Sequence, residues 1–349
     1  MIKYLLNLTR ELSVSKQSTD GSETNYTTGG YIQLSSSFLP ICSLLWQLNQ
    51  PEIFMRHFVA LIVGLALISC KLTLPTVYEA QFSSDPTVAA VAPGQIDEAS
   101  GIADSRSQPG NLWVEQDSGS PAELALLGYD GKVKGKISVP NYTNRDWEEL
   151  TIGPGPNNGV NYIYIGEIGD NNAQYPVVQV YRLPEPASLQ TPITQVDRIN
   201  FRYPDGPRDA EAMFVDPQTK DIYIVSKRED QVHLYSLPYP QNLNEITVAK
   251  SLGTLPSFGG GLANYVTSAA ISTDGSEIIV RTYTNLYFWK RNENQSIADA
   301  LTLGTFRALP IRLEPQGEAV CFDKDNKGYF TLSERATASS VNLYYFSRK

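Results

Sequence analysis

The sequence predicts an all-β protein, a β-propeller built from five four-stranded blades. Three observations lead to this prediction. Similar segments open at residues 98, 146, 209, 266 and 316, a spacing of roughly 50–60 residues. Each segment holds about four short apolar or alternating runs, separated by turns rich in Gly, Pro, Asp and Asn. No longer stretch shows a helical period with caps at its ends.

The strands expected in each blade are short runs rich in β-branched and aromatic residues. The first unit has them at 98–103, 112–114, 125–127 and 136–139, and the second at 146–152, 162–165, 178–183 and 198–201. The third has them at 209–215, 222–225, 232–235 and 246–248. The fourth has them at 266–271, 278–280 and 286–289, and the fifth at 316–320, 328–332 and 343–346.

The ring must also close, because an open sheet edge invites aggregation. The fifth unit lacks an outer strand, whereas residues 76–82 form a strand candidate that belongs to no unit. We therefore expect this N-terminal strand to complete the last blade. A ring of six blades is the alternative, if residues 78–93 contain a degenerate blade.

Composition and charge restrict the partners of the protein. The chain of 349 residues has a net charge of −9 and no long basic run, which argues against a nucleic-acid partner. A hydrophobic content of 42% is ample for a core. We expect a monomer.

The N-terminal region predicts a membrane address. Residues 1–54 are rich in Ser, Thr, Gln and Asn and read as a non-native or unusual extension, with Met55 as the expected start. Residues 55–69 resemble a lipoprotein signal peptide, in which Arg56 precedes an uncharged apolar run that is too short to span a bilayer. The run ends in Leu-Ile-Ser-Cys, so Cys70 is the expected lipidation site. An ordinary signal peptide or a buried apolar segment is the alternative.

This address implies a lipid-anchored protein of the cell envelope that faces the periplasm or the exterior. Residues 70–97 would then be a tether with the closing strand, and residues 98–349 the propeller. Of the three cysteines, Cys42 lies in the leader and Cys70 carries lipid, which leaves Cys321 without a disulfide partner. Cys321 lies within an apolar strand and is expected to be a small core residue.

The topology of a blade predicts where functional side chains gather. The first strand of each blade lines the channel and the second returns antiparallel to it. The start of strand one and the end of strand two therefore share one face. That face collects many acidic residues and a few cations: Glu98, Asp117, Asp146, Glu148, Glu167, Asp170, Asp209, Glu211, Lys227, Arg281, Gln316, Glu318 and Glu334.

A ring of carboxylates on converging loops suits a hard cation such as Ca²⁺, which takes oxygen ligands. The candidate metal ligands are Glu98, Glu148, Glu167, Asp170, Glu211 and Glu318. The candidate ligand-binding residues are Trp147, Lys227, Arg281 and Glu334. The two cations could pair with a phosphate or carboxylate group. The alternative is structural, with these side chains bonded within turns or between blades, and no catalytic residue is assigned.

Four motifs carry a resemblance to a known family. They are the Asp-x-Glu-Ala opening at 209–212, Gly-Asp-Asn at 169–171, Arg-Thr-Tyr-Thr at 281–284 and Gln-Gly-Glu-Ala at 316–319. Together they resemble secreted bacterial β-propellers of unassigned function, from about residue 98 to the C-terminus. More distantly, the blade openings are similar to those of β-propeller phytases and gluconolactonase-type propellers, which hold calcium or another divalent metal at the channel mouth.

Two functions follow as expectations. The first is binding of a small ligand or a protein at the acidic channel mouth. The alternative, implied by the more distant resemblance, is a calcium-dependent hydrolase of phosphoesters, esters or lactones.

Overall fold

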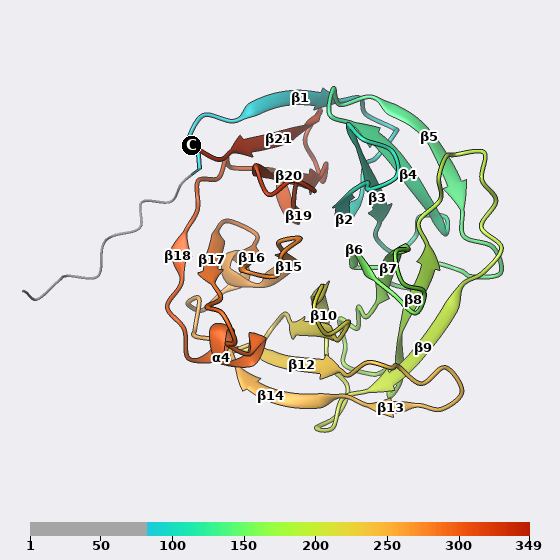
Figure 1. Cartoon of the computed structure of the whole chain (residues 1–349). Coiled ribbons are helices and arrows are strands. Elements are labelled where there is room, and N and C mark those ends of the chain that lie inside the picture. The colour runs from blue at the N-terminus through green and yellow to red at the C-terminus, as the bar shows by residue number, and fades with distance from the viewer. Residues whose placement is uncertain (1–81) are drawn as a thin grey trace, which may run out of the picture. The chain divides into compact units, whose positions relative to one another are not determined.

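The computed structural model describes residues 82–349, which form five sheets arranged as a five-bladed β-propeller (Figure 1). Blade 1 consists of β2 (Ala99–Asp104), β3 (Asn111–Gln116), β4 (Glu123–Gly128) and β5 (Val133–Ser138). Blade 2 consists of β6 (Glu149–Pro154), β7 (Asn161–Glu167), β8 (Val178–Pro184) and β9 (Asp197–Arg202). The predicted fold class and blade number are therefore confirmed.

The remaining blades follow the same order from the axis outward. Blade 3 consists of β10 (Ala210–Val215), β11 (Ile222–Ser226), β12 (His233–Leu237) and β14 (Lys250–Thr254). Blade 4 consists of β15 (Val266–Ile271), β16 (Glu277–Thr282), β17 (Leu286–Lys290) and β18 (Arg307–Ala308). Blade 5 consists of β19 (Gln316–Phe322), β20 (Gly328–Glu334), β21 (Val341–Ser347) and β1 (Thr87–Val91).

An N-terminal strand closes the ring, as predicted, but it is not the predicted strand. β1 pairs antiparallel with β21, and Val91 lies opposite Val341. The expected segment 76–82 lies outside the described residues except for Phe82, which forms a single bridge with Arg348. The alternative of a sixth blade in 78–93 is wrong for the described part of that stretch, which contributes β1 alone. The β-branched pair Thr87-Val88 signalled this strand in the sequence.

Short elements fill the connections between blades. β13 (Thr247–Val248) pairs parallel with β9, so it adds a fifth strand to the edge of blade 2 before the chain enters β14. α4 (Ile297–Thr302) joins β17 to β18, and the Ser296 hydroxyl accepts from the backbone N–H of Asp299 to cap it. η2 (Leu262–Asn264) precedes blade 4. Within residues 82–349, no helix has the length and apolar character that crossing a bilayer requires.

Apolar side chains of neighbouring sheets pack between the blades. Trp147, Tyr181 and Leu183 belong to one such cluster, and Phe214, Val280 and Trp289 to another. Cys321 is buried among apolar residues, as its strand predicted. This inter-blade packing fixes the positions of the inner strands.

The inner strands β2, β6, β10, β15 and β19 contact one another in this order around the axis (Figure 1). Four of them carry a β-bulge near the first residue, at Ser100, Glu211, Thr267 and Glu318. A bulge inserts one residue into a strand and redirects a side chain, so it is common beside functional sites. Two of the four bulged residues are glutamates.

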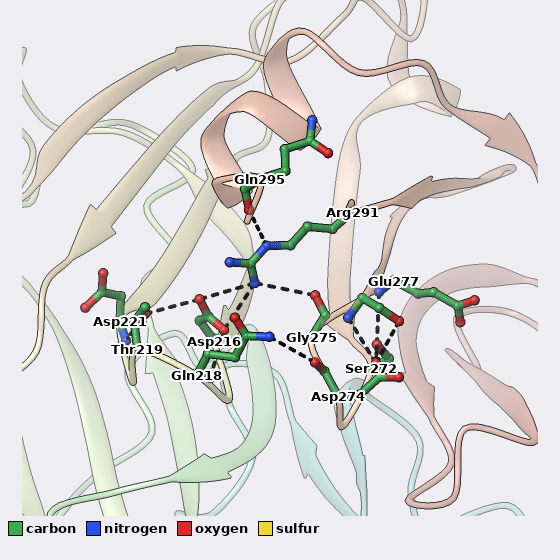
Figure 2. A network of polar contacts seen from close by, with 11 residues as sticks. Asp216, Gln218, Thr219, Asp221, Ser272, Asp274, Gly275, Glu277, Arg291 and Gln295 are labelled. Carbon is green, nitrogen blue, oxygen red and sulfur yellow. Dashed lines mark hydrogen bonds and ion pairs between the residues drawn. The ribbon is translucent and has the colours of Figure 1, made fainter. Parts of the chain in front are cut away.

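The turns at the other end of the inner strands are fixed by polar contacts between blades. Arg291, which follows β17, donates to Asp216 of blade 3 at 3.4 Å and to the carbonyl of Gly275 at 3.4 Å (Figure 2). It also donates to the carbonyl of Gln295 at 2.6 Å. Asp216 is buried, so this arginine holds the first turns of blades 3 and 4 together.

Candidate functional site

The starts of the inner strands bring carboxylates from three blades together. Asp117 follows β3 in blade 1, and Asp146 and Glu148 precede β6 in blade 2. Asp209 and Glu211 lie at the start of β10 in blade 3, the latter at its bulge. Glu148, Asp209 and Glu211 are each buried to 94% or more, with exposed fractions of 4%, 6% and 4%.

These residues form two overlapping carboxylate groups that share Glu148. The first group is Asp117, Asp146 and Glu148, and the second is Glu148, Asp209 and Glu211. Within each group, one oxygen of every carboxylate lies within 4.8 Å of the others. Two oxygens that bind the same Ca²⁺ ion, each at about 2.4 Å, cannot be more than about 4.8 Å apart. Both groups therefore have a spacing that a single cation could bridge.

One buried cation accompanies the carboxylates. The Lys227 ammonium forms an ion pair with Oε1 of Glu211, and its Nζ lies 5.1 Å from the centre of the Tyr283 ring. Oε2 of Glu211 is buried and has no hydrogen-bond partner. Glu318 repeats this pattern, because Oε1 accepts from Nε2 of Gln316 at 3.0 Å whereas Oε2 is buried without a partner. Two buried carboxylate oxygens of the site thus lack a partner within the described chain.

Burial and crowding raise the proton affinity of these carboxylates. Burial is the main cause that raises the pKa of Glu148 and of Glu211 well above the ordinary value, and neighbouring carboxylates add to it. The pKa of Glu318 is raised to about 8, again chiefly by burial, although Lys227 opposes the shift. The pKa of Asp146 is raised to about 6 by burial and by Asp117 and Asp209. Lys227 pairs with Glu211 and Arg228 pairs with Asp209, so two cations face the five carboxylates of the two groups and do not balance their charge when all five are ionised.

Two predicted ligand-binding residues are fully buried in contacts between blades. Trp147 is fully buried, and its ring centre lies 6.3 Å from that of Tyr181 in the cluster between blades 1 and 2. Arg281 is also fully buried, where it pairs with Glu314 and donates to the carbonyl of Ala319 at 2.7 Å. Both serve packing between blades, so the structure does not present either side chain to a ligand. From the sequence alone, the size of Trp147 and the charge of Arg281 fit a ligand-binding role and a structural role equally well.

The other predicted residues divide between the site and its surroundings. Lys227 and Glu318 lie beside the second carboxylate group, and Glu334, whose pKa burial raises to about 8, accepts from Gln316. Glu98 is exposed and belongs to neither carboxylate group.

Two further predicted metal ligands have structural roles. Glu167 accepts from the Tyr181 hydroxyl and lies 3.6 Å from Arg145. Asp170 accepts from the backbone N–H groups of Gln174 and Tyr175 at 2.8 and 2.7 Å. Asp170 thus closes its own turn.

Sequence reasoning placed Asp117, Asp146 and Asp209 on this face but did not select them as metal ligands. Asp117 directly follows β3, Asp209 directly precedes β10, and Asp146 lies in the loop that leads into β6, and these positions were the available signal. Glu149 was missed as well. It accepts from the Ser268 hydroxyl at 2.6 Å and from the backbone N–H of Ala269 at 2.9 Å, so it crosses from blade 2 to blade 4.

No protein-family model matches the chain, and no curated protein matches it. Among solved structures, a luciferin-regenerating enzyme is similar at 12% identity and a TM-score of 0.41, over 75% of this chain and 95% of that one. Kuenenia stuttgartiensis hydrazine synthase is similar at 10% identity and a TM-score of 0.40, over 74% of this chain and 98% of that one.

Proposed function

We propose that this propeller binds a small ligand at its acidic channel mouth through a divalent cation, with Ca²⁺ the best-suited ion. The observation that carries the proposal is the group formed by Glu148, Asp209 and Glu211, whose carboxylate oxygens lie within 4.8 Å of one another. All three side chains are buried, and one oxygen of Glu211 has no partner. Hard oxygen donors of this kind suit Ca²⁺, which takes six to eight oxygen ligands.

The charge balance of the site supports the same proposal. The pKa values of Glu148 and Glu211 are raised, first by burial and then by neighbouring charges, so each resists ionisation without a counter-charge. A bound divalent cation supplies that counter-charge and favours the ionised forms. Lys227 stays paired with Glu211 and limits the negative charge left over. An anionic or carbonyl oxygen of a ligand would complete the coordination of the ion.

A metal-dependent hydrolase of phosphoesters, esters or lactones is the second candidate. Asp146 favours it, because burial and nearby carboxylates raise its pKa to about 6. A carboxylate that titrates near neutral pH is a suitable general base. Asp146 shares the first carboxylate group with Asp117 and Glu148, so if those two residues held an ion, Asp146 would lie beside it and could accept a proton from water there. Lewis-acid activation of that water is the chemistry that the bound ion would supply.

We also propose a membrane location for the protein. Residues 55–70 have the order of a lipoprotein signal, and they lie outside the described residues. We infer that Cys70 carries lipid and holds the propeller at the cell envelope.

Isothermal titration of the full chain with CaCl₂ and with MgCl₂ tests the cation proposal. We expect Ca²⁺ to bind and Mg²⁺ to bind more weakly, since Mg²⁺ demands a tighter octahedral site. A panel of phosphomonoester, carboxylic ester and lactone substrates, each with Ca²⁺ and with a chelator, separates the two candidates. Turnover that the chelator abolishes favours the hydrolase. Absence of a heat signal for every divalent cation refutes both.

A further inference from the structure

A cavity lies at the opposite end of the channel from the carboxylate groups. Its volume is about 570 Å³. Its lining comes from the ends of inner strands and the turns that follow them in all five blades, namely Arg106, Gly153, Pro154, Val215, Pro217, Ile271, Thr273 and Lys324 among others. The carboxylate groups lie instead at the starts of the inner strands. A volume of this size is typical of small-molecule sites, which measure about 300–1,000 Å³.

Arg106 lines this cavity, its guanidinium forms no hydrogen bond or ion pair within the described residues, and its charge opposes the raised pKa of the nearby Asp104. Nη1 of its guanidinium is buried from solvent and has no hydrogen-bond partner in the described chain. The other cation of the lining, Lys324, is paired at 3.0 Å with Asp325. A buried guanidinium nitrogen without a partner is costly, because a buried donor loses its water and gains nothing in return. Nη1 itself is out of reach of solvent, so a ligand in the cavity would meet the remaining nitrogens of the Arg106 guanidinium.

The loop that carries Arg106 is held in place, although the side-chain nitrogen is not. One oxygen of Glu185 accepts from the Ser105 hydroxyl at 2.7 Å and from the backbone N–H of Arg106 at 2.9 Å. The same oxygen accepts from Nε1 of Trp113 at 3.2 Å. Together with the backbone N–H of Ser107, which donates to the same oxygen at 3.2 Å, the first two donors fix the backbone around Arg106. A fixed backbone lowers the entropy that the guanidinium loses when it binds a ligand.

The nearby carboxylate of Asp104 is already satisfied by other donors. Its two oxygens accept from the Tyr129 hydroxyl at 2.7 Å and from the backbone N–H of Lys324 at 2.6 Å. By contrast, the guanidinium of Arg291, near the same end of the propeller, donates hydrogen bonds to Asp216 and to backbone carbonyls (Figure 2). That network holds the turns of blades 3 and 4, which form one wall of the cavity. Of these two arginines, only Arg106 is left for a ligand.

The remaining lining defines the rest of such a ligand. Apolar groups of Ile152, Val215 and Ile271 face the cavity, as do several prolines. We propose that this cavity is a second binding site, which takes a small organic anion. Its carboxylate or phosphate group binds the Arg106 guanidinium, and its apolar body packs against the ends of the inner strands. Arginine binds both anionic groups through two parallel hydrogen bonds.

Matched probes of the full chain test the site. We expect benzoate or phenyl phosphate to bind by isothermal titration, with the uncharged benzamide at least roughly tenfold weaker than benzoate. Arg106→Gln is expected to weaken anion binding by at least roughly tenfold, and Arg106→Lys by less, since lysine keeps the charge without the planar fork. Arg312→Gln is the control, because Arg312 is half exposed and pairs only with the exposed Asp85.

Glu211→Gln distinguishes the two ends of the channel. Anion binding at Arg106 should persist in this variant and in the presence of a chelator, because the carboxylate groups lie at the other channel mouth. Anion binding that is lost in Glu211→Gln but kept in Arg106→Gln overturns the proposal. So does the failure of benzoate and of phenyl phosphate to bind the wild-type chain at concentrations on the order of 10 mM. Equal affinity for benzoate and benzamide would likewise overturn it.

Discussion

Replacement of Glu211 with Gln is the most direct perturbation of the proposed cation site. The substitution keeps the size of the side chain and removes one charge from the group formed with Glu148 and Asp209. A ligand bound only by the folded state stabilises that state by about 2.7 kcal/mol at a hundredfold excess over its dissociation constant. For a domain of this size, that free energy corresponds to a rise in melting temperature of roughly 5–10 °C. We expect the wild-type protein to show this rise with Ca²⁺ and the variant to lose it.

The stability of the variant without calcium can be estimated from the contacts of Glu211. Loss of one partner of a buried ion pair costs about 3–5 kcal/mol when the other charge is left alone. Lys227 is not left alone, because Glu318 and Glu148 also favour its charged form. The substitution also removes repulsion between Glu211 and Glu148, a repulsion that contributes to the raised pKa of Glu148. We therefore expect a loss below about 2 kcal/mol, the range of a single charge-assisted hydrogen bond.

Thermal melts of wild type, Glu211→Gln and Glu98→Gln, with a chelator and across a calcium titration, measure both quantities. Glu98 is an exposed carboxylate at the start of the first blade that belongs to neither group, so Glu98→Gln should keep the full calcium shift. A wild-type melting temperature that calcium does not change refutes the cation site. A calcium shift that both variants lose equally would show that only overall negative charge matters.

Three further outcomes are expected. Glu318 and Glu334 have pKa values raised to about 8, so between roughly pH 4.5 and 8 the folded state binds more protons than the unfolded state, and without metal the free energy of unfolding should fall as pH rises, by about 1.4 kcal/mol per pH unit for each carboxyl that titrates alone. Thermal melts at pH 6 and 8.5 measure this change. The calcium shift should be larger at pH 8.5, because Ca²⁺ competes with protons for the same carboxylates. In the closing strand, Val91 is 1% exposed and Val88 is 54% exposed. Val91→Asp should therefore lower the free energy of unfolding by at least about 3 kcal/mol, whereas Val88→Asp should be tolerated. Equal denaturation midpoints for the two variants would contradict the closure by β1. Expressed from Met55 in a host that processes lipoproteins, the protein should fractionate with membranes and Cys70→Ala should not be lipidated; a lipid-free wild-type protein would refute the anchor.

The fold could be predicted from the sequence because its signals are local. Apolar runs of strand length and turn residues recur along the chain, so the strands of each blade can be located from its own segment of sequence. Ring closure was predicted from the missing fourth strand of the fifth unit. The strand itself was misplaced, because residues 76–82 and Thr87–Val91 both read as short strands. Only the pairing of β1 with β21 identifies which of them completes the blade.

The face on which the carboxylates gather could be predicted from the sequence, since strand direction alone places the blade openings at one end of the channel. Which carboxylates meet was decided by the tertiary structure. Glu148 and Glu211 converge with aspartates from neighbouring blades, whereas Asp170 closes its own turn and Arg281 is buried between blades 4 and 5. The distances between carboxylates of different blades depend on β-bulges and on packing between sheets. These contacts join residues that are far apart along the chain, so they leave no local pattern in the sequence.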